Sequence, residues 1–419
     1  MAEKLAIRGG TRLIPEGTIK KWPPIDETDK KLVMESLLGA NHAFGPNCNA
    51  FQEEFAAWNG NKYAITTNSG TAALHMCLVA CDCGTGGEVI VPAYSWSSSA
   101  TCVMQHNSIP VFVDIDFDSM NIDPDKIEQA ITSKTKAIIA VHLHGLPAQM
   151  DRIMAIAKKH NLKVIEDACQ AHGAKFDGKK VGTIGDCAAF SFNQNKCLCA
   201  GEGGMFVTDS EEMLEKARAL WSFGETITDM KNRDYHVYSM GWMYRNSDLN
   251  AAFGRAQLKK LDDYLAYQRE STKHLTELLK DVPYLILPTS PQKCETNGYN
   301  YTIRFDLKAM GCEEDASEFR YKIIEALKAE GVETGVWQRF ILPAMAVFQA
   351  KNGYGKGCPW HCPNAQEVDY SVEQYPMAQK HCDTHTGMTM PLRLPNDLKT
   401  VMLMADGFRK VMENIDQIK

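Results

Sequence analysis

One lysine of this chain stands where an apolar strand is expected to end. Lys196 follows the apolar run Phe190–Phe192 and precedes a glycine-rich turn, Gly201–Gly204. A lysine held there can form a Schiff base with an aldehyde and, once released, can act as a general base. Most lysines are solvated surface residues, so Lys196 becomes informative only together with suitable partners.

An acidic residue supplies the first such partner. The apolar run Val164–Ile165 leads directly into Glu166 and Asp167. Asp167 could serve only as a helix cap, but it could also pair with a protonated ring nitrogen, since each charge favours the other. A lysine Schiff base and a carboxylate on a pyridinium are the protein's share of pyridoxal phosphate chemistry. Gln170 could then hydrogen-bond the ring hydroxyl of that cofactor.

A strand-to-helix turn at Ser69, Gly70 and Thr71 could hold a phosphate. A helix N-terminus offers unpaired N–H groups and the positive end of the helix dipole. Ordinary capping of the helix by Ser or Thr is the alternative. Ser191 could add a further hydroxyl donor. Trp96 could stack on the cofactor ring, or it could be an aromatic residue of the core.

Short apolar runs alternate with amphipathic ones between residues 60 and 220. We predict strands at 63–66, 88–92, 110–114, 137–141, 162–165 and 205–207, and helices at 71–80, 97–106, 124–131 and 150–160. This alternation predicts β-α units and a mostly parallel sheet, whose ligands bind at the carboxyl ends of the strands. Asp167 and the Ser69–Thr71 turn both fall at such ends.

A second unit is expected after this region. About 40 N-terminal residues are expected to be irregular, and a long helix is predicted over 247–279. The later elements are strands at 301–305 and 332–336, a helix at 316–329 and an amphipathic helix from 398. We therefore divide the chain into residues 1–250, an N-terminal segment with a large domain, and residues 251–419, a linking helix with a smaller α+β domain.

The composition is that of an ordinary globular protein, with 44% hydrophobic and 23% charged residues. A net charge of −7 argues against binding to nucleic acid. No apolar run reaches the roughly 18–20 residues that cross a bilayer, and the first residues lack a signal-peptide pattern. We expect no membrane partner and a cytoplasmic location, in which the 14 cysteines are reduced thiols.

A cluster of cysteines and histidines near the C-terminus has the residue types of a zinc site: Cys358, Cys362, His381, Cys382 and His385. Cysteines occur throughout the chain, however, and the neighbouring prolines indicate a packed surface loop. Ligand types without geometry are weak support for a metal. We assign no metal site and leave the role of this cluster open.

The order of the motifs resembles the DegT/DnrJ/EryC1/StrS family of sugar aminotransferases. The motifs are Asn68–Leu74, Val91–Trp96, Asp114–Asp116, Thr135–Ile138, Val141–Gly145, Glu166–Gln170, Phe190–Phe192, Lys196 and Gly201–Gly204. The resemblance covers about residues 20–415. It implies the fold-type-I architecture of pyridoxal-phosphate enzymes: a large α/β domain with a mostly parallel seven-stranded sheet, a smaller C-terminal domain, and a homodimer that shares its active sites.

The resemblance also implies roles for individual residues. Lys196 would bind the cofactor covalently and Asp167 would pair with the pyridine nitrogen. The remaining cofactor-binding residues would be Ser69, Gly70, Thr71, Trp96, Gln170 and Ser191.

One motif departs from the family pattern. Relatives carry an asparagine that reaches the phosphate of the neighbouring subunit, where this chain has Met243 within Gly241–Arg245. Methionine has no amide donor, so we expect Arg245 or Asn246 to make this contact. Some family members are dehydratases with histidine in place of the lysine, and Lys196 argues against that branch.

These residues predict an aminotransferase that moves an amino group from glutamate or glutamine to a ketone. The resemblance leaves two acceptors equally open, a nucleotide-linked keto-sugar and a cyclitol such as scyllo-inosose. Trp337 and Arg339 could lie near this substrate, although a structural arginine is an equal alternative. Other readings are a dehydratase, an aromatising enzyme like 3-amino-5-hydroxybenzoate synthase, or a regulator that binds a ligand without turnover.

Overall fold

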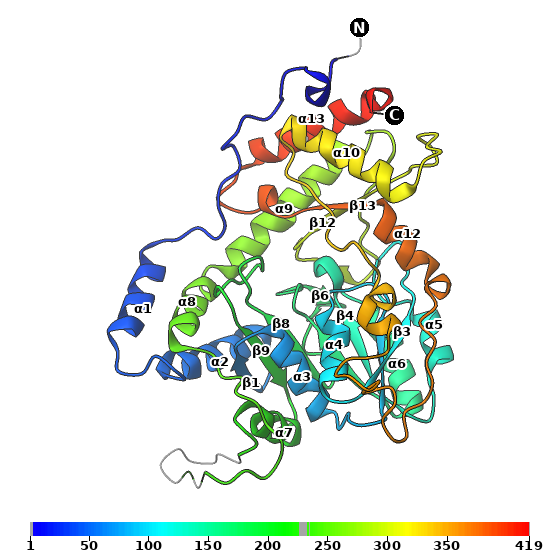
Figure 1. The fold of residues 1–419 in the computed structure, drawn as a ribbon. Coiled ribbons are helices and arrows are strands. Elements are labelled where there is room, and N and C mark those ends of the chain that lie inside the picture. Colours follow the sequence, from blue (N-terminus) through cyan, green and yellow to red (C-terminus); the bar gives the residue numbers. More distant parts are fainter. Residues whose placement is uncertain (1–2, 226–232, 234, 419) are drawn as a thin grey trace.

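A seven-stranded sheet forms the centre of the larger part of the molecule (Figure 1). The structure is a computed structural model that describes residues 3–225, 233 and 235–418. In spatial order the strands are β1 (Tyr63–Thr67), β9 (Gly204–Thr208), β8 (Cys187–Ser191), β5 (Lys163–Asp167), β4 (Thr135–Val141), β2 (Glu88–Pro92) and β3 (Ile109–Val113).

Strands β8, β5, β4, β2 and β3 run parallel to one another, and β9 is antiparallel to both of its neighbours. The predicted mostly parallel α/β sheet is therefore confirmed. Asp167 pairs with Val141 on one side and with Ala189 on the other. Because parallel strands end at the same edge, this register places Asp167 beside the end of β8, from which Lys196 follows.

Helices cover both faces of the sheet: α2 (Pro46–Asn59), α3 (Gly70–Ala80), α4 (Ser98–Gln105), α5 (Pro124–Ile127), α6 (Met150–His160) and α7 (Glu211–Trp221). Helix α3 contacts β8, β9 and α7, and nearly all of its side chains are buried. Its N-terminus is fixed by the Ser69 hydroxyl, which accepts a hydrogen bond from the Ala72 N–H at 3.1 Å.

The smaller part of the molecule is built on a three-stranded antiparallel sheet of β10 (Leu285–Ile286), β12 (Tyr301–Phe305) and β13 (His385–Met388). Its other elements are α10 (Ala316–Glu330), α12 (Pro376–Thr384) and α13 (Leu398–Glu413), whereas the short helix α11 (Ala346–Gln349) packs through Phe348 on the core of the larger part. The strand predicted at 332–336 is wrong. β13 occupies the edge of β12, and residues 332–336 touch this sheet only through a bridge between Gly335 and Gly387.

The N-terminal region is more regular than predicted. Helix α1 (Glu27–Leu38) is capped by Asp26, which accepts from the Thr28 and Asp29 N–H groups. The predicted helix over 247–279 forms two helices, α8 (Asp248–Leu258) and α9 (Leu261–Leu279). The proposed boundary at residue 250 lies within α8 and stays a proposal.

A third, minor sheet joins β11 (Cys294–Glu295), β6 (Lys175–Phe176) and β7 (Lys179–Lys180). Within the described ranges, no helix has the length and apolar character needed to span a membrane.

Candidate active site

A cavity of about 600 Å³ lies at the carboxyl ends of β5 and β8. Segments from both parts of the molecule line it. The lining residues are Ser69, Gly70, Thr71, Leu74, Trp96, Ser98, Ser99, Asp167, Cys169, Gln170, Ser191, Asn193, Asn195, Lys196, Glu202, Tyr299, Glu333, Trp337, Thr389 and Met390. Every residue assigned to the cofactor from the sequence is present here except Arg245 and Asn246.

The Asp167 carboxylate is held in one orientation. Its side chain is buried, and its Oδ2 accepts a hydrogen bond from the Ser99 hydroxyl at 2.7 Å. The Cys169 N–H donates to Oδ1 at 3.2 Å. The Ser95 hydroxyl lies 2.8 Å from that of Ser99 and extends this chain of hydroxyls. Ser99 could not be identified from the sequence, because nothing in its neighbourhood indicates which strand end helix α4 faces.

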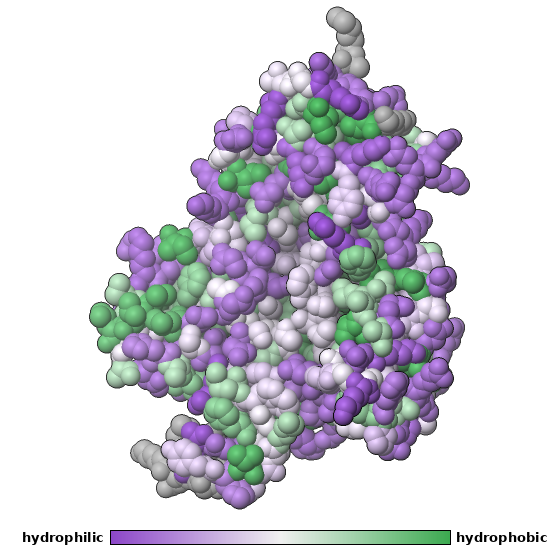
Figure 2. Space-filling view, viewed as in Figure 1, coloured by the Kyte–Doolittle hydropathy of each residue, from purple (hydrophilic) through white to green (hydrophobic). Residues whose placement is uncertain are grey.

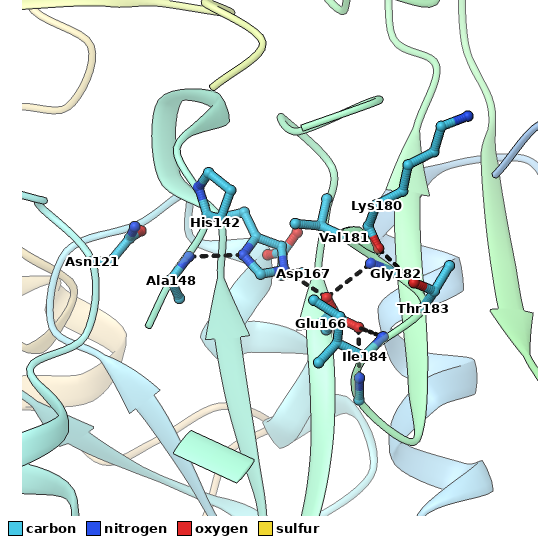
Figure 3. Close-up of polar contacts among 12 residues, drawn as sticks. Asn121, His142, Ala148, Glu166, Asp167, Lys180, Val181, Gly182, Thr183 and Ile184 are labelled. Carbon is cyan, nitrogen blue, oxygen red and sulfur yellow. Dashed lines mark hydrogen bonds and ion pairs between the residues drawn. The ribbon is translucent and has the colours of Figure 1, made fainter. Parts of the chain in front are cut away.

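A second carboxylate, Glu166, anchors the same strand end (Figure 3) and does not line the cavity. Glu166 is fully buried and accepts hydrogen bonds from the Gly182, Ile184 and Gly185 N–H groups at 2.7–2.8 Å. His142 Nδ1 accepts from a backbone N–H, so its Nε2 carries the proton and donates to Glu166 at 2.9 Å.

Burial alone would raise the pKa of Glu166. The hydrogen bonds from His142 and the backbone outweigh that effect and hold the pKa below its usual value. An ionised carboxylate therefore fixes the end of β5 from which Asp167 projects.

The Lys196 amine points to a tyrosine across the cavity. Nζ donates to the Tyr299 hydroxyl at 3.4 Å and lies 4.8 Å from the centre of its ring. Burial lowers the pKa of Lys196, but the polar neighbours, Tyr299 first, raise it, and the pKa ends above its ordinary value. The amine is thus an ammonium at neutral pH and must lose a proton before it can attack a carbonyl.

Close packing surrounds the turn before helix α3. A Cβ added at Gly70 would lie 2.7 Å from the Ser191 Cβ and 3.0 Å from the Cys169 Sγ, so glycine is required there. The Thr71 hydroxyl lies 2.8 Å from that of Ser98. The first N–H groups of an α-helix have no partner within the helix, so this end of α3 can hold an anionic group. The Ser69 hydroxyl itself serves as the helix cap.

Two aromatic side chains and an amide complete the walls. Trp96 is 53% exposed, and its ring centre lies 6.1 Å from that of Trp337. Gln170 Oε1 accepts from the His144 N–H at 2.9 Å, so its amide NH₂ is the group left to donate to a ligand. Of the two residues expected near substrate, Trp337 lines the cavity and Arg339 does not.

These features fit pyridoxal phosphate. The cavity joins a helix N-terminus for a phosphate, a buried carboxylate for a ring nitrogen, an amide donor, an exposed aromatic face and a lysine. Its volume is within the range of small-molecule sites. Within the described part of the chain, Lys196 forms no ion pair with an acidic side chain. Its amine is therefore available for this role.

The stretch expected to reach a second subunit lies outside the cavity. Met243 is 51% exposed, and the Arg245 guanidinium lies 5.3 Å from the centre of the Phe223 ring. Asn246 is buried and donates to the Thr66 hydroxyl at 3.2 Å. The Asn246 side chain is therefore used within its own subunit, which favours Arg245 for the predicted contact.

The cysteine and histidine cluster is split between two places. Cys358 and Cys362 lie on a loop with their sulfur atoms 3.2 Å apart. His381 and His385 stack on each other in the core, 4.7 Å between ring centres. Among the residues that the structure describes, no group of three or more such side chains could hold a metal ion.

The sequence is similar to known proteins over most of its length. Residues 23–386 match the DegT/DnrJ/EryC1/StrS aminotransferase family. The chain belongs to this family. As a member of this family, it is a pyridoxal-phosphate-dependent sugar aminotransferase.

Among the relatives, the GDP-perosamine synthase of Caulobacter vibrioides is 39% identical over 68% of this chain and 74% of its own length. A putative L-glutamine:3-amino-2,3-dideoxy-scyllo-inosose aminotransferase of Micromonospora echinospora is 36% identical over 80% of this chain and 79% of its own. The solved structure of 3-amino-5-hydroxybenzoic acid (AHBA) synthase is similar with a TM-score of 0.84 and 26% identity, covering 94% of this chain and 99% of that one.

Proposed function

We propose that this enzyme transfers an amino group from glutamate or glutamine to a ketone of a nucleotide-linked sugar or of a cyclitol. The observation that carries the proposal is the cavity in which Lys196, Asp167 and the N-terminus of α3 meet. The named relatives support both acceptor classes, because one acts in GDP-perosamine synthesis and another is named for an amino-inosose.

The residues of the cavity would have different roles in this reaction. Pyridoxal phosphate, when bound, supplies an aldehyde for the amine and a ring that accepts the electron pair from the substrate carbon. Asp167 would hold a proton on the ring nitrogen, with Ser99 and the Cys169 N–H fixing its carboxylate. Lys196 would be displaced from the cofactor by the amine of the donor. Its released amine would then move a proton from the Cα atom of the donor to the carbon that carried the aldehyde. Tyr299 keeps the released amine within the cavity.

Orientation and exclusion of water fall to the surrounding side chains. The N-terminus of α3, with Thr71 and Ser191, would hold the phosphate, and Gln170 would donate to the ring oxygen. Trp96, which is half exposed at the cavity, would cover one face of the ring.

The direct test of the proposed function follows both half-reactions. The purified enzyme is treated with glutamate or glutamine, and the loss of the visible absorbance band identifies the donor. A panel of keto-sugars and inososes is then added to the aminated enzyme. We expect one ketone class to restore the band and to yield an aminated product. If neither donor alters the band and no panel member yields an amine, the proposed reaction is wrong.

The structural likeness to AHBA synthase favours one alternative, an aromatising enzyme. Such an enzyme would convert a cyclic amino-ketone into an aromatic product and release water. Ultraviolet absorbance and mass analysis of the products distinguish it from the aminotransferase, whose product keeps a saturated ring. A non-enzymatic regulator would bind the cofactor or sugar without forming either product.

We further propose a homodimer in which each cavity receives Arg245 of the partner copy. Large hydrophobic side chains are exposed on α1 and near Arg245, and Figure 2 shows green patches over α1 and beside α7. The patch residues are Met34, Leu37, Leu38, Phe223, Val237, Tyr238, Met240 and Met243. Apolar patches of this kind are typical of subunit interfaces.

A further inference from the structure

Two buried side chains from opposite ends of the chain contact residues 194–197, the loop that carries Lys196 and is called the lysine loop below. Trp22 belongs to the N-terminal segment, and Arg393 follows the short helical turn Met390–Leu392. Their side chains are 8% and 1% exposed, and neither lines the cavity. Nothing in the proposed reaction requires them to touch the cofactor or the substrate.

Trp22 is bound to the lysine loop at both of its polar ends. Its indole N–H donates to the Lys196 carbonyl at 3.1 Å, and its own carbonyl accepts from the Gln194 amide at 2.9 Å. The ring packs edge-on against Tyr264 of α9, with 4.9 Å between ring centres. The backbone of Lys196 is thereby tied to a helix outside the sheet.

Arg393 joins two walls of the cavity. One guanidinium nitrogen donates to the Asn195 carbonyl at 2.9 Å, and the other donates to the Tyr299 carbonyl at 3.3 Å. Asn195 and Tyr299 both line the cavity. The guanidinium also lies 5.0 Å from the Trp22 ring and 5.4 Å from the Tyr299 ring. It therefore fixes the distance between the lysine loop and the tyrosine that accepts from the Lys196 amine.

The burial of Arg393 is costly for stability. Its Nε has no hydrogen-bond partner, and within the described residues no acidic side chain forms an ion pair with it. A buried cation without a counter-ion is unfavourable, so its contacts with backbone carbonyls and aromatic faces must offset that cost. Those contacts converge on the lysine loop.

We propose that Trp22 and Arg393 are positioning residues for Lys196. They hold residues 194–197 so that the amine faces Tyr299 and the carbonyl carbon it must attack. This inference rests on the proposed role of Lys196 as the residue that binds the cofactor. It also makes the N-terminal segment and the small domain part of the catalytic apparatus, although neither supplies a group that reacts.

The test uses two variants. Trp22→Phe keeps a ring but removes the N–H, and Arg393→Lys keeps the charge but cannot donate to the Asn195 and Tyr299 carbonyls at the same time. Trp360→Phe and Arg320→Lys are the matched controls. Trp360 is 6% exposed and donates to the Tyr370 hydroxyl at 2.9 Å. Arg320 is 2% exposed, lies 4.4 Å from the Tyr321 ring, donates to the Cys382 carbonyl, and also has an unpartnered Nε.

Four quantities are measured on the loaded enzyme: the rate of cofactor release, the pH midpoint of the visible band of the lysine-bound cofactor, kcat and KM. Because one hydrogen bond is lost, both Trp22→Phe and Arg393→Lys should speed release and lower kcat about three- to tenfold, with KM nearly unchanged. The pH midpoint should also shift. The controls should leave all four quantities unchanged even where they lower the melting temperature equally.

The inference is overturned if the first two variants behave like wild type in release, pH midpoint and kcat. It is also overturned if the controls change these quantities as much, because the effect would then be general destabilisation. If Arg393→Lys does not fold, Trp22→Phe decides alone. Failure of the proposed function is a separate outcome, since it would appear in the wild type as cofactor that is not attached to Lys196.

Discussion

At the scale of single residues, the proposed chemistry depends on the carboxylate of Asp167. Replacing Asp167 with alanine should lower kcat about ten- to a hundredfold, because a charge-assisted hydrogen bond to the ring nitrogen is lost. The fold should survive, since this carboxylate stabilises a charge on the cofactor ring and contributes little to packing. Stopped-flow turnover and the melting temperature measure the two effects. Turnover near that of wild type, with an unaltered visible band, would show that Asp167 does not face the ring.

The hydroxyl behind this carboxylate allows a finer test. Ser99→Ala removes the donor at 2.7 Å from Asp167, and we expect kcat to fall about three- to tenfold with little change in KM. Ser119→Ala is the control, because the buried Ser119 donates to Asp116 at the same distance and neither residue lines the cavity. Equal kinetic losses in both variants would contradict a specific role for Ser99.

Nine of the 20 residues that line the cavity could be named from the sequence, and there is a physical reason for that part of the outcome. Asp167 and Ser191 end strands β5 and β8 and Lys196 follows β8, and parallel strands bring their carboxyl ends together. Tyr299 and Ser99 could not be predicted in the same way. Tyr299 comes from the second unit, and its place opposite Lys196 depends on how that unit packs on the first.

At the scale of elements, Glu166 fixes the end of β5. Glu166→Gln places an NH₂ group among three backbone N–H donors, so we expect the free energy of unfolding to fall by about 2–4 kcal/mol. Cofactor release should be faster, because Asp167 is the next residue. Glu330→Gln is the control: Glu330 is also fully buried and accepts from the Ala6 N–H at 2.7 Å, but it lies in the smaller unit. It should lower stability without changing cofactor release.

The stability that Glu166 contributes should also depend on pH. Its folded-state pKa lies below the ordinary value of 4.5, so its contribution is present above that pH and is lost as the pH falls through the folded-state pKa. The difference in unfolding free energy between wild type and Glu166→Gln should therefore shrink on acidification below about pH 4.5. Urea unfolding between pH 3.5 and pH 7, roughly, tests this. A difference that stays constant across the range would contradict an ionised Glu166.

The elements predicted wrongly have features that a local pattern does not reveal. Strand β13 contains His385, Thr386 and Gly387, which lack the apolar alternation of a strand. It forms because β12 offers an unpaired edge. In addition, His385 Nε2 is hydrogen-bonded to the Tyr94 hydroxyl in the core, at 3.1 Å. The segment 332–336, which was predicted as a strand, meets this sheet only at Gly335.

At the scale of the whole molecule, the proposed shared site predicts complementation between damaged subunits. Lys196→Ala and Arg245→Ala homodimers should each have little activity. Mixed after partial unfolding and refolding, they should regain up to about a quarter of wild-type activity, because half of the dimers are then heterodimers with one undamaged site. Arg409→Ala, at a half-buried position on α13, is the control and should be active alone. No recovery on mixing, or full activity of Arg245→Ala alone, would contradict the shared site.

The central claim is that the Lys196 amine binds the cofactor. Borohydride reduction of the loaded enzyme makes that bond permanent, and peptide mapping by mass spectrometry then identifies the modified lysine. We predict a single reduced adduct on the peptide that contains Lys196, with none after Lys196→Ala. An adduct on another lysine, or no adduct in an enzyme that shows the visible band, would contradict the account.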